Sequence, residues 1–194
     1  MTQPDLFPAP APQPLHRLFF ALWPDDALRA QAAGVAAELR RRHGNDGRLL
    51  NPRRYHLTLR FLGDFPGELP ASALAGARAA GDAVRAPAFE LVLDRAGSFG
   101  RNRSIPWWLG CAPDHAALQA LWRRLGEALA QRRLRDASGH RTLAPHLTVV
   151  RDARRALPET PIVPLHWRVD RFVLVHSELG QRNAYTLLGE WPLG

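Results

Sequence analysis

The sequence predicts an α+β fold in which helices cover antiparallel β-sheets. Two observations predict it. Apolar runs of strand length are interspersed with segments of helical period, and their order, βαβαββαβββ, lacks the regular alternation of a parallel sheet. No glycine-rich phosphate loop follows a strand, which argues against P-loop and dinucleotide-binding folds. A length of 194 residues with 46% hydrophobic residues suits a single domain.

The N-terminal third predicts a tail followed by strand, helix and strand. Residues 1–15 contain five prolines and are expected to form a disordered tail outside the fold. The apolar run Leu18–Leu22 has the length of a buried strand. Asp25 then marks the start of a helix with apolar residues at helical spacing, which ends at Gly44. The run Tyr55–Leu62 predicts the second strand.

Seven further elements complete the domain, which we expect to span residues 16–194. In order, they are an alanine-rich helix over 74–84, strands over 89–93 and 105–110, a helix over 118–129, and strands near 146, over 169–175 and over 185–188. A glycine-containing turn over 180–183 joins the last two strands as a hairpin.

The charge balance is strongly basic. The formal net charge is +8, the pI is about 11.3, and all 26 basic residues are arginine. Guanidinium groups match phosphate oxygens in pairs, so a phosphate-bearing partner is indicated. A lysine-free, alanine-rich chain is also typical of a GC-biased genome, so composition alone leaves the partner open.

The cysteine content and the apolar runs bear on cellular location. Cys111 is the single cysteine, so an internal disulfide is excluded, and the apolar run before it predicts that it is buried and inert. No apolar run approaches the roughly 20 residues that cross a bilayer. We therefore expect a cytoplasmic protein without membrane contact. We also expect a monomer, although nothing in the sequence fixes the oligomeric state.

Two matching hexapeptides carry the chemistry. His56-Leu57-Thr58-Leu59-Arg60-Phe61 and His146-Leu147-Thr148-Val149-Val150-Arg151 lie 90 positions apart, and each contains His-x-Thr in a predicted strand. For this composition, chance gives roughly 0.25 such triplets per chain, so two in matching strands are informative. Because side chains alternate along a strand, the His and Thr of each motif share one face. The opposite face, which we expect to lie in the core, carries Leu57, Leu59, Leu147 and Val149.

Two imidazoles and two hydroxyls suit phosphodiester hydrolysis. One neutral imidazole can take a proton from water while a second, protonated one gives a proton to the departing oxygen. The hydroxyls can bind non-bridging phosphate oxygens, and arginine can neutralise the remaining charge. For either motif taken alone, the alternative is a structural role, in which the histidine lies at a strand end and only hydrogen-bonds to the backbone. The other six histidines show no metal-ligand spacing.

The doubled motif resembles the 2H phosphoesterase superfamily with its two HxTx motifs. Further segments are similar to one branch, the RNA 2′,3′-cyclic phosphodiesterases, also described as 2′-5′ RNA ligases; they are Arg17–Leu22, His56–Gly63, Trp107–Gly110, Pro145–Ala153 and Ser177–Leu187. The resemblance runs from about residue 16 to the end of the chain. It implies two pseudo-symmetric lobes of antiparallel sheet, with helices outside, around a central cleft to which each lobe gives one His-x-Thr strand.

The resemblance also implies roles for individual residues. His56 would give a proton to the departing 3′ oxygen of an RNA 2′,3′-cyclic phosphate, and His146 would activate water. Thr58 and Thr148 would bind phosphate oxygens. Arg151 matches an arginine that often follows the second motif, although strict alternation from His146 directs it to the other face unless a bulge intervenes.

Arg60 has the parity for the cleft and is a second candidate for phosphate binding. Aromatic residues in the same segments are candidates for stacking on an RNA base. One of the adjacent Phe19 and Phe20 should reach the cleft, and we assign Phe20; Trp108 and Tyr185 are the other two candidates.

The expected partner is therefore RNA or an oligonucleotide with a 2′,3′-cyclic phosphate end, and no metal or other cofactor is required. Three alternatives stay open at this point. The chain could join RNA by 2′-5′ linkages, hydrolyse another cyclic or 2′-5′ nucleotide, or bind RNA ends without turnover. Analysis of the product separates these possibilities.

Overall fold

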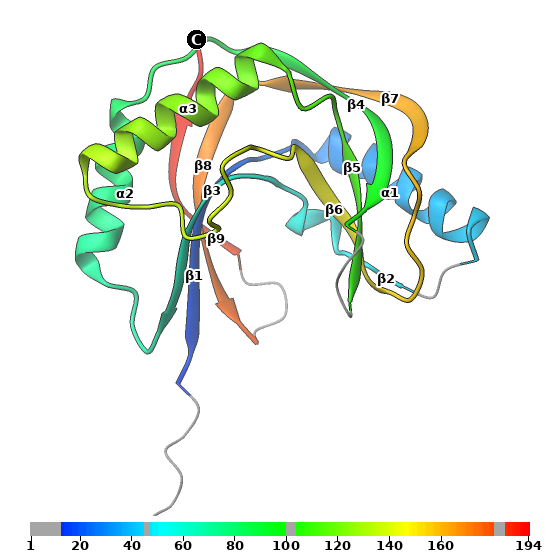
Figure 1. Ribbon diagram of the computed structural model, residues 1–194, viewed down its shortest axis with the longest axis horizontal. Helices are drawn as coiled ribbons and strands as arrows, with labels where there is room; N and C mark the ends of the chain where they lie inside the picture. The colour runs from blue at the N-terminus through cyan, green and yellow to red at the C-terminus, as the bar shows by residue number, and fades with distance from the viewer. Residues whose placement is uncertain (1–12, 45–46, 100–103, 181–184) are drawn as a thin grey trace, which may run out of the picture.

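The computed structural model describes residues 13–44, 47–99, 104–180 and 185–194. The first twelve residues of the predicted tail, and most of the predicted turn over 180–183, lie outside these ranges. Within them, no helix is both long and apolar enough to cross a membrane. Figure 1 shows an α+β fold whose strands gather into two groups, with the helices on their outer sides.

The described strands form one antiparallel sheet in the order β7-β4-β5-β6-β3-β1-β8-β9, with β2 paired to β6. We call its two halves the first and the second lobe. The first lobe contains β1 (Leu15–Leu22), β3 (Leu57–Pro66), β8 (Arg171–Leu179) and β9 (Tyr185–Pro192). The second contains β2 (Arg48–Leu49), β4 (Phe89–Ser98), β5 (Ile105–Gly110), β6 (His146–Ala153) and β7 (Thr160–Val169).

The two lobes meet where β3 and β6 pair through one residue from each strand, Leu57 opposite Leu147. These are the central residues of the two His-x-Thr motifs. In an antiparallel pair, a local two-fold axis passes between directly opposed residues. The chain therefore places both motifs around one pseudo-two-fold axis, at the junction of the lobes.

The helices pack on the outer faces of the lobes. Helix α1 (Asp26–Arg42) follows β1 of the first lobe but packs against β6 and β7 of the second. Helices α2 (Ala71–Ala83) and α3 (Ala116–Gln131) cover the first lobe, where α2 contacts β8 and β9 and α3 contacts β3. Asp25 caps α1 by accepting a 2.7 Å hydrogen bond from the amide of Leu28, as expected for its N-terminal position.

The core confirms the predicted burial of the apolar residues in the two motifs. Leu57, Leu147 and Val149 are fully buried, and Leu59 is 2% exposed. Cys111 is also buried, and burial raises the pKa of its thiol to about 11, so the residue stays a protonated, unreactive thiol near neutral pH.

Two strands were not predicted. One strand is predicted over 169–175, whereas the chain forms two, β7 (Thr160–Val169) and β8 (Arg171–Leu179), which Asp170 separates. Pro161 and Pro164 hid β7, because proline lacks an amide donor; β7 accepts them because it is the edge strand of its lobe. The other missed strand, β2, is only two residues long.

Candidate active site

The site begins with the pairing of β3 and β6 at the pseudo-two-fold axis. His56 and Thr58 flank Leu57, and His146 and Thr148 flank Leu147. All four polar side chains are half-buried, whereas both leucines are fully buried, so each His and Thr share the face opposite the core. Diagonal neighbours across an antiparallel pair lie about 7–8 Å apart, which leaves room for one phosphate group between two imidazoles.

Both imidazoles are oriented by the same backbone contact. The Nδ1 of His56 lies 2.7 Å from the carbonyl oxygen of Arg54, and the Nδ1 of His146 lies 2.8 Å from that of Ala144. A carbonyl only accepts, so each Nδ1 carries the hydrogen and donates it. No hydrogen bond to a described residue occupies either Nε2. These two nitrogens are therefore the ones available for proton transfer.

The environment of the pair lowers both pKa values. Burial lowers the pKa of His56 from 6.5 to about 4, and nearby positive charges on His146, Arg151 and Arg54 act in the same direction. Burial also lowers the pKa of His146, with the same help from His140 and Arg151. In the unliganded protein at neutral pH, both imidazoles are neutral. A bound phosphate anion would favour protonation of one of them.

A β-bulge in β6 turns Arg151 toward the site. Trp108 lies opposite Thr148 and Trp107 lies opposite Val150, so Val149 is an extra residue in β6. Val149 and Val150 are consequently both fully buried, and the alternation resumes with Arg151 on the side of Thr148. Arg151 is exposed, and its charge acts on both imidazoles.

An equivalent bulge in β3 turns Arg60 away from the cleft. Ala21 lies opposite Thr58 and Phe20 lies opposite Arg60, so Leu59 is the extra residue. Arg60 is 9% exposed; it donates to the carbonyl of Trp122 in α3 at 2.8 and 3.2 Å and pairs with Asp136 at 3.4 Å. Its assignment to phosphate binding is contradicted, because its guanidinium binds protein groups beneath α3.

Phe20 is also assigned wrongly. It is fully buried in the main core, where its ring packs against Phe172 and Trp191. Its neighbour Phe19 faces the cleft instead, and the centroids of the Phe19 and His56 rings lie 4.9 Å apart. Sequence alternation allowed either choice for this adjacent pair, and only the strand register decides between them.

The other two stacking candidates lie beside the imidazoles. Tyr185 packs edge-on against His56 at 5.4 Å, and its hydroxyl accepts a 3.2 Å hydrogen bond from Arg54. Trp108 lies opposite Thr148 in the sheet, and its ring contacts Phe99, which in turn packs edge-on against His146 at 4.8 Å. Each imidazole is therefore bordered by aromatic rings from its own lobe.

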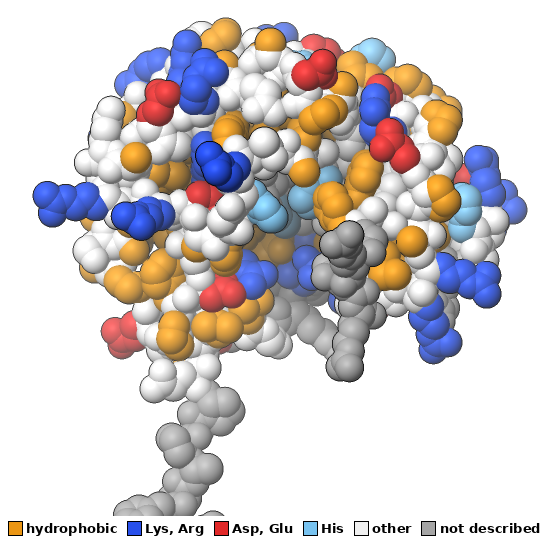
Figure 2. All heavy atoms as spheres, viewed as in Figure 1, with side chains coloured by type: hydrophobic (Ala, Val, Ile, Leu, Met, Phe, Trp, Pro, Cys, Tyr) orange, Lys and Arg blue, Asp and Glu red, His pale blue; other side chains and the backbone are white. Residues whose placement is uncertain are grey.

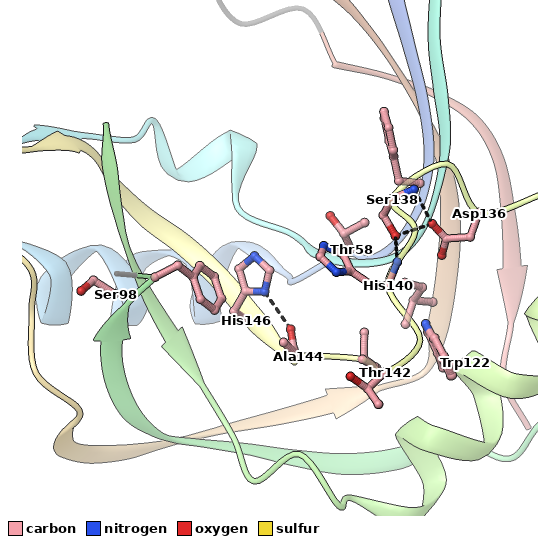
Figure 3. Close-up of a pocket in the computed structure, with 13 residues that line it drawn as sticks. Thr58, Ser98, Trp122, Asp136, Ser138, His140, Thr142, Ala144 and His146 are labelled. Carbon is pink, nitrogen blue, oxygen red and sulfur yellow. Dashed lines mark hydrogen bonds between the residues drawn. The ribbon is translucent and has the colours of Figure 1, made fainter. Parts of the chain in front are cut away.

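A cavity of about 800 Å³ opens beside His146 and Thr58. Figure 2 shows histidine side chains in the hollow at the centre of this face. Apolar, hydroxyl and imidazole side chains line the cavity, and Figure 3 shows that many of them come from the connection between α3 and β6. The lining includes the side chains of Phe61, Phe99, Trp122, Asp136, Ser138 and His140.

Comparison with known proteins decides the family. The model of the 2'-5' RNA ligase superfamily matches residues 24–181. The chain belongs to this superfamily. It is 33% identical over 184 residues to the RNA 2',3'-cyclic phosphodiesterase of Escherichia coli, covering 91% of this chain and 96% of the relative. It is 32% identical over 186 residues to the protein of that name from Thermus thermophilus, covering 91% and 90%.

Solved structures agree with this assignment. The structure of E. coli LigT in apo form matches with a TM-score of 0.73 at 32% identity, covering 93% of this chain and 98% of LigT. LigT complexed with 3'-AMP matches with a TM-score of 0.70 at 32% identity and the same coverage. The superfamily fold, with helices on a bilobal antiparallel sheet, is therefore the fold of this chain.

In this member of the superfamily, sequence reasoning missed several residues that border the imidazoles. Arg54 is one, because a 3₁₀ turn (Pro52–Arg54) rather than a motif brings it to His56 and Tyr185. His140 is another, since its segment has no regular structure. Among the described residues, no group of three or more His, Cys, Asp and Glu side chains is placed to hold a metal ion.

Proposed function

We propose that this cleft opens the 2′,3′-cyclic phosphate at the end of an RNA and leaves a 2′-phosphomonoester. One observation carries the proposal: two imidazoles, each with Nδ1 fixed by a backbone carbonyl, share one face across the Leu57 and Leu147 pair. The relatives named RNA 2',3'-cyclic phosphodiesterase, the 3'-AMP complex of LigT and the net charge of +8 support an RNA substrate.

The proposed reaction is an in-line displacement at phosphorus. Water attacks the phosphorus and gives a proton to the Nε2 of His146, while the bond from phosphorus to the 3′ oxygen breaks. That oxygen leaves as a hydroxyl after it takes a proton from the Nε2 of His56. Both imidazoles have equivalent backbone contacts, so the family resemblance, rather than geometry, supports this assignment of acid and base.

The remaining side chains of the site supply charge and orientation. Thr58 and Thr148 donate hydrogen bonds to the non-bridging oxygens. Arg151, turned to this face by the bulge in β6, neutralises the negative charge that grows in the transition state. Tyr185, which packs against His56, and Trp108, which lies opposite Thr148, stack on the nucleobases of the bound strand in this proposal.

The test uses an oligonucleotide that ends in a 2′,3′-cyclic phosphate, incubated with purified protein in EDTA. Accumulation of the 2′-monoester is expected, and His56→Ala and His146→Ala should each lose about 10² to 10⁴ in rate. Inhibition by the chelator would contradict the acid and base mechanism, and a 3′-monoester would reverse the choice of leaving group. Binding without turnover would make the chain an RNA-end binding protein.

Ligation through a 2′-5′ linkage is the second candidate, because the matching family model carries that name. The same two imidazoles would serve with their roles exchanged, since ligation reverses the displacement. Adding a second oligonucleotide with a free 5′ hydroxyl discriminates: a joined product that exceeds the hydrolysis product would favour ligation.

A further inference from the structure

The connection between α3 and β6, residues 132–145, brings a third histidine to the site. His140 lines the cavity that Thr58 and His146 also line. In Figure 3 its imidazole extends from the connection into the cavity, on the side that faces His146. The side chain is exposed, and its ring makes no hydrogen bond to any described residue. The ring is therefore free to donate to a ligand.

Strand β3 anchors this connection at two points. The amide of Ala137 donates a 2.7 Å hydrogen bond to the carbonyl of Phe61. The guanidinium of Arg60 pairs with Asp136, and both side chains are largely buried, at 11% and 15% exposure. These anchors lie two and three residues after Thr58, so the position of the connection is set relative to the first His-x-Thr motif.

A relay of hydrogen bonds leads from the buried pair to His140. The Oδ2 of Asp136 faces Arg60, and its Oδ1 accepts from both the amide and the hydroxyl of Ser138, at 2.9 and 2.6 Å. The Ser138 hydroxyl oxygen accepts a 3.2 Å hydrogen bond from the amide of His140. Such a turn fixes the backbone from which the imidazole projects.

The charge of His140 also acts on His146. A positive charge on His140 lowers the pKa of His146, so the two imidazoles sense each other across the cavity. A phosphate between Thr58 and His146 would lie within the same field. An imidazole with a free donor nitrogen beside such an anion suits a charge-assisted hydrogen bond.

We propose that His140 is a third imidazole that hydrogen-bonds the phosphate of the bound substrate, and that Arg60 and Asp136 are positioning residues that hold it there. The identity of the substrate rests on the function proposed above. The role of His140 is binding rather than proton transfer, because two imidazoles already account for both protons of the reaction.

The experiment measures kcat and KM for adenosine 2′,3′-cyclic phosphate, together with equilibrium binding of adenosine 2′-monophosphate and of adenosine. In His140→Ala, KM and the dissociation constant of the monophosphate should each rise about tenfold, which is typical of one hydrogen bond to a charged group. kcat should change little, since a contact made equally in both states alters binding alone. Adenosine binding should be unchanged.

Two variants act as matched controls. His166→Ala removes an imidazole from the outside of β7, where the ring is 69% exposed, and should leave every constant unchanged. His140→Gln keeps an N–H donor and should recover part of the affinity. Asp136→Asn should raise KM in the parent chain but add nothing in the His140→Ala background, because Asp136 acts through His140.

The outcomes separate this inference from the proposed function. Unchanged affinity for the monophosphate in His140→Ala would overturn the inference, as would an equal loss of affinity for adenosine. An additive effect of Asp136→Asn in the double variant would remove the positioning role. If the parent chain turns over no cyclic phosphate, the proposed function fails, and the dissociation constant of inorganic phosphate in parent and variant still decides the role of His140.

Discussion

Arg60→Met should destabilise the fold strongly, although the sequence pattern predicts that Arg60 binds phosphate in the cleft. The guanidinium donates twice to the carbonyl of Trp122, lies 3.5 Å from the centre of the Trp122 ring, and pairs with Asp136. Methionine keeps the apolar stem but leaves the largely buried Asp136 carboxylate without its counter-charge. Breaking one partner of a buried pair costs about 3–5 kcal/mol.

This loss is a large share of the roughly 5–15 kcal/mol that stabilises a domain, and it should lower the melting temperature by roughly 6–20 °C. Urea unfolding followed by tryptophan fluorescence measures it, with Arg151→Ala as the control. Arg151 is exposed, so its replacement should change stability by less than about 0.5 kcal/mol. The double variant Arg60→Met/Asp136→Leu removes both charges and should regain part of the loss. The rest remains because the amide and hydroxyl of Ser138 lose their acceptor.

The reverse pattern would refute this reasoning. If Arg60→Met left unfolding unchanged while Arg151→Ala destabilised the protein, the bulge at Leu59 would be absent and Arg60 would face the cleft. If Arg60→Met lost catalytic activity but kept its full stability, the same conclusion would follow.

Three other predictions follow from the same geometry. Gly126→Ala in α3 should destabilise the protein, although alanine favours helices by about 1 kcal/mol, because the new methyl group collides with the Arg60 guanidinium; thermal unfolding measures this. Arg151→Ala removes a charge that lowers both catalytic pKa values, so the pH profile of kcat/KM should move to higher pH while KM rises. Folding lowers the pKa of His56 from 6.5 to about 4, so the unfolded chain takes up this proton at a higher pH than the folded chain does. The free energy of unfolding should therefore fall by up to about 3 kcal/mol between pH 6.5 and pH 4. Urea unfolding at a series of pH values measures this fall, which should be smaller in His56→Asn.

The sequence was sufficient for features that depend on local pattern. The repeated His-x-Thr triplets identified the two strands that meet at the cleft, and the alternation around them placed Leu57 and Leu147 in the core. The helix over 26–42 followed from its capping aspartate and its apolar spacing. In each case the signal lies within a few residues of the feature, so no distant contact is needed to interpret it.

The errors arose where strand register overrides alternation. Arg60 has the parity of Thr58, and Phe20 is as apolar as its neighbour Phe19, so pattern alone could not orient either residue. A bulge inserts one residue into a strand and reverses the parity of everything beyond it. Since bulges depend on the partner strand, the facing of Arg60 follows only from its pairing with β1.

The two bulges keep the lobes symmetric around the imidazoles, and the residues that follow the bulges make the cleft asymmetric. Both motifs insert their extra residue at the same place, Leu59 in β3 and Val149 in β6, so positions 60 and 150 turn inward and positions 61 and 151 turn to the cleft. The symmetry ends with the residue types. At this position the first lobe has Phe61, which lines the cavity, and the second has the exposed Arg151, whose charge acts on both imidazoles. Equivalent imidazoles cannot set the direction of attack by themselves. An apolar ring on one side and a guanidinium on the other give the cleft two chemically different ends, and this asymmetry suits the directional displacement at phosphorus that we propose.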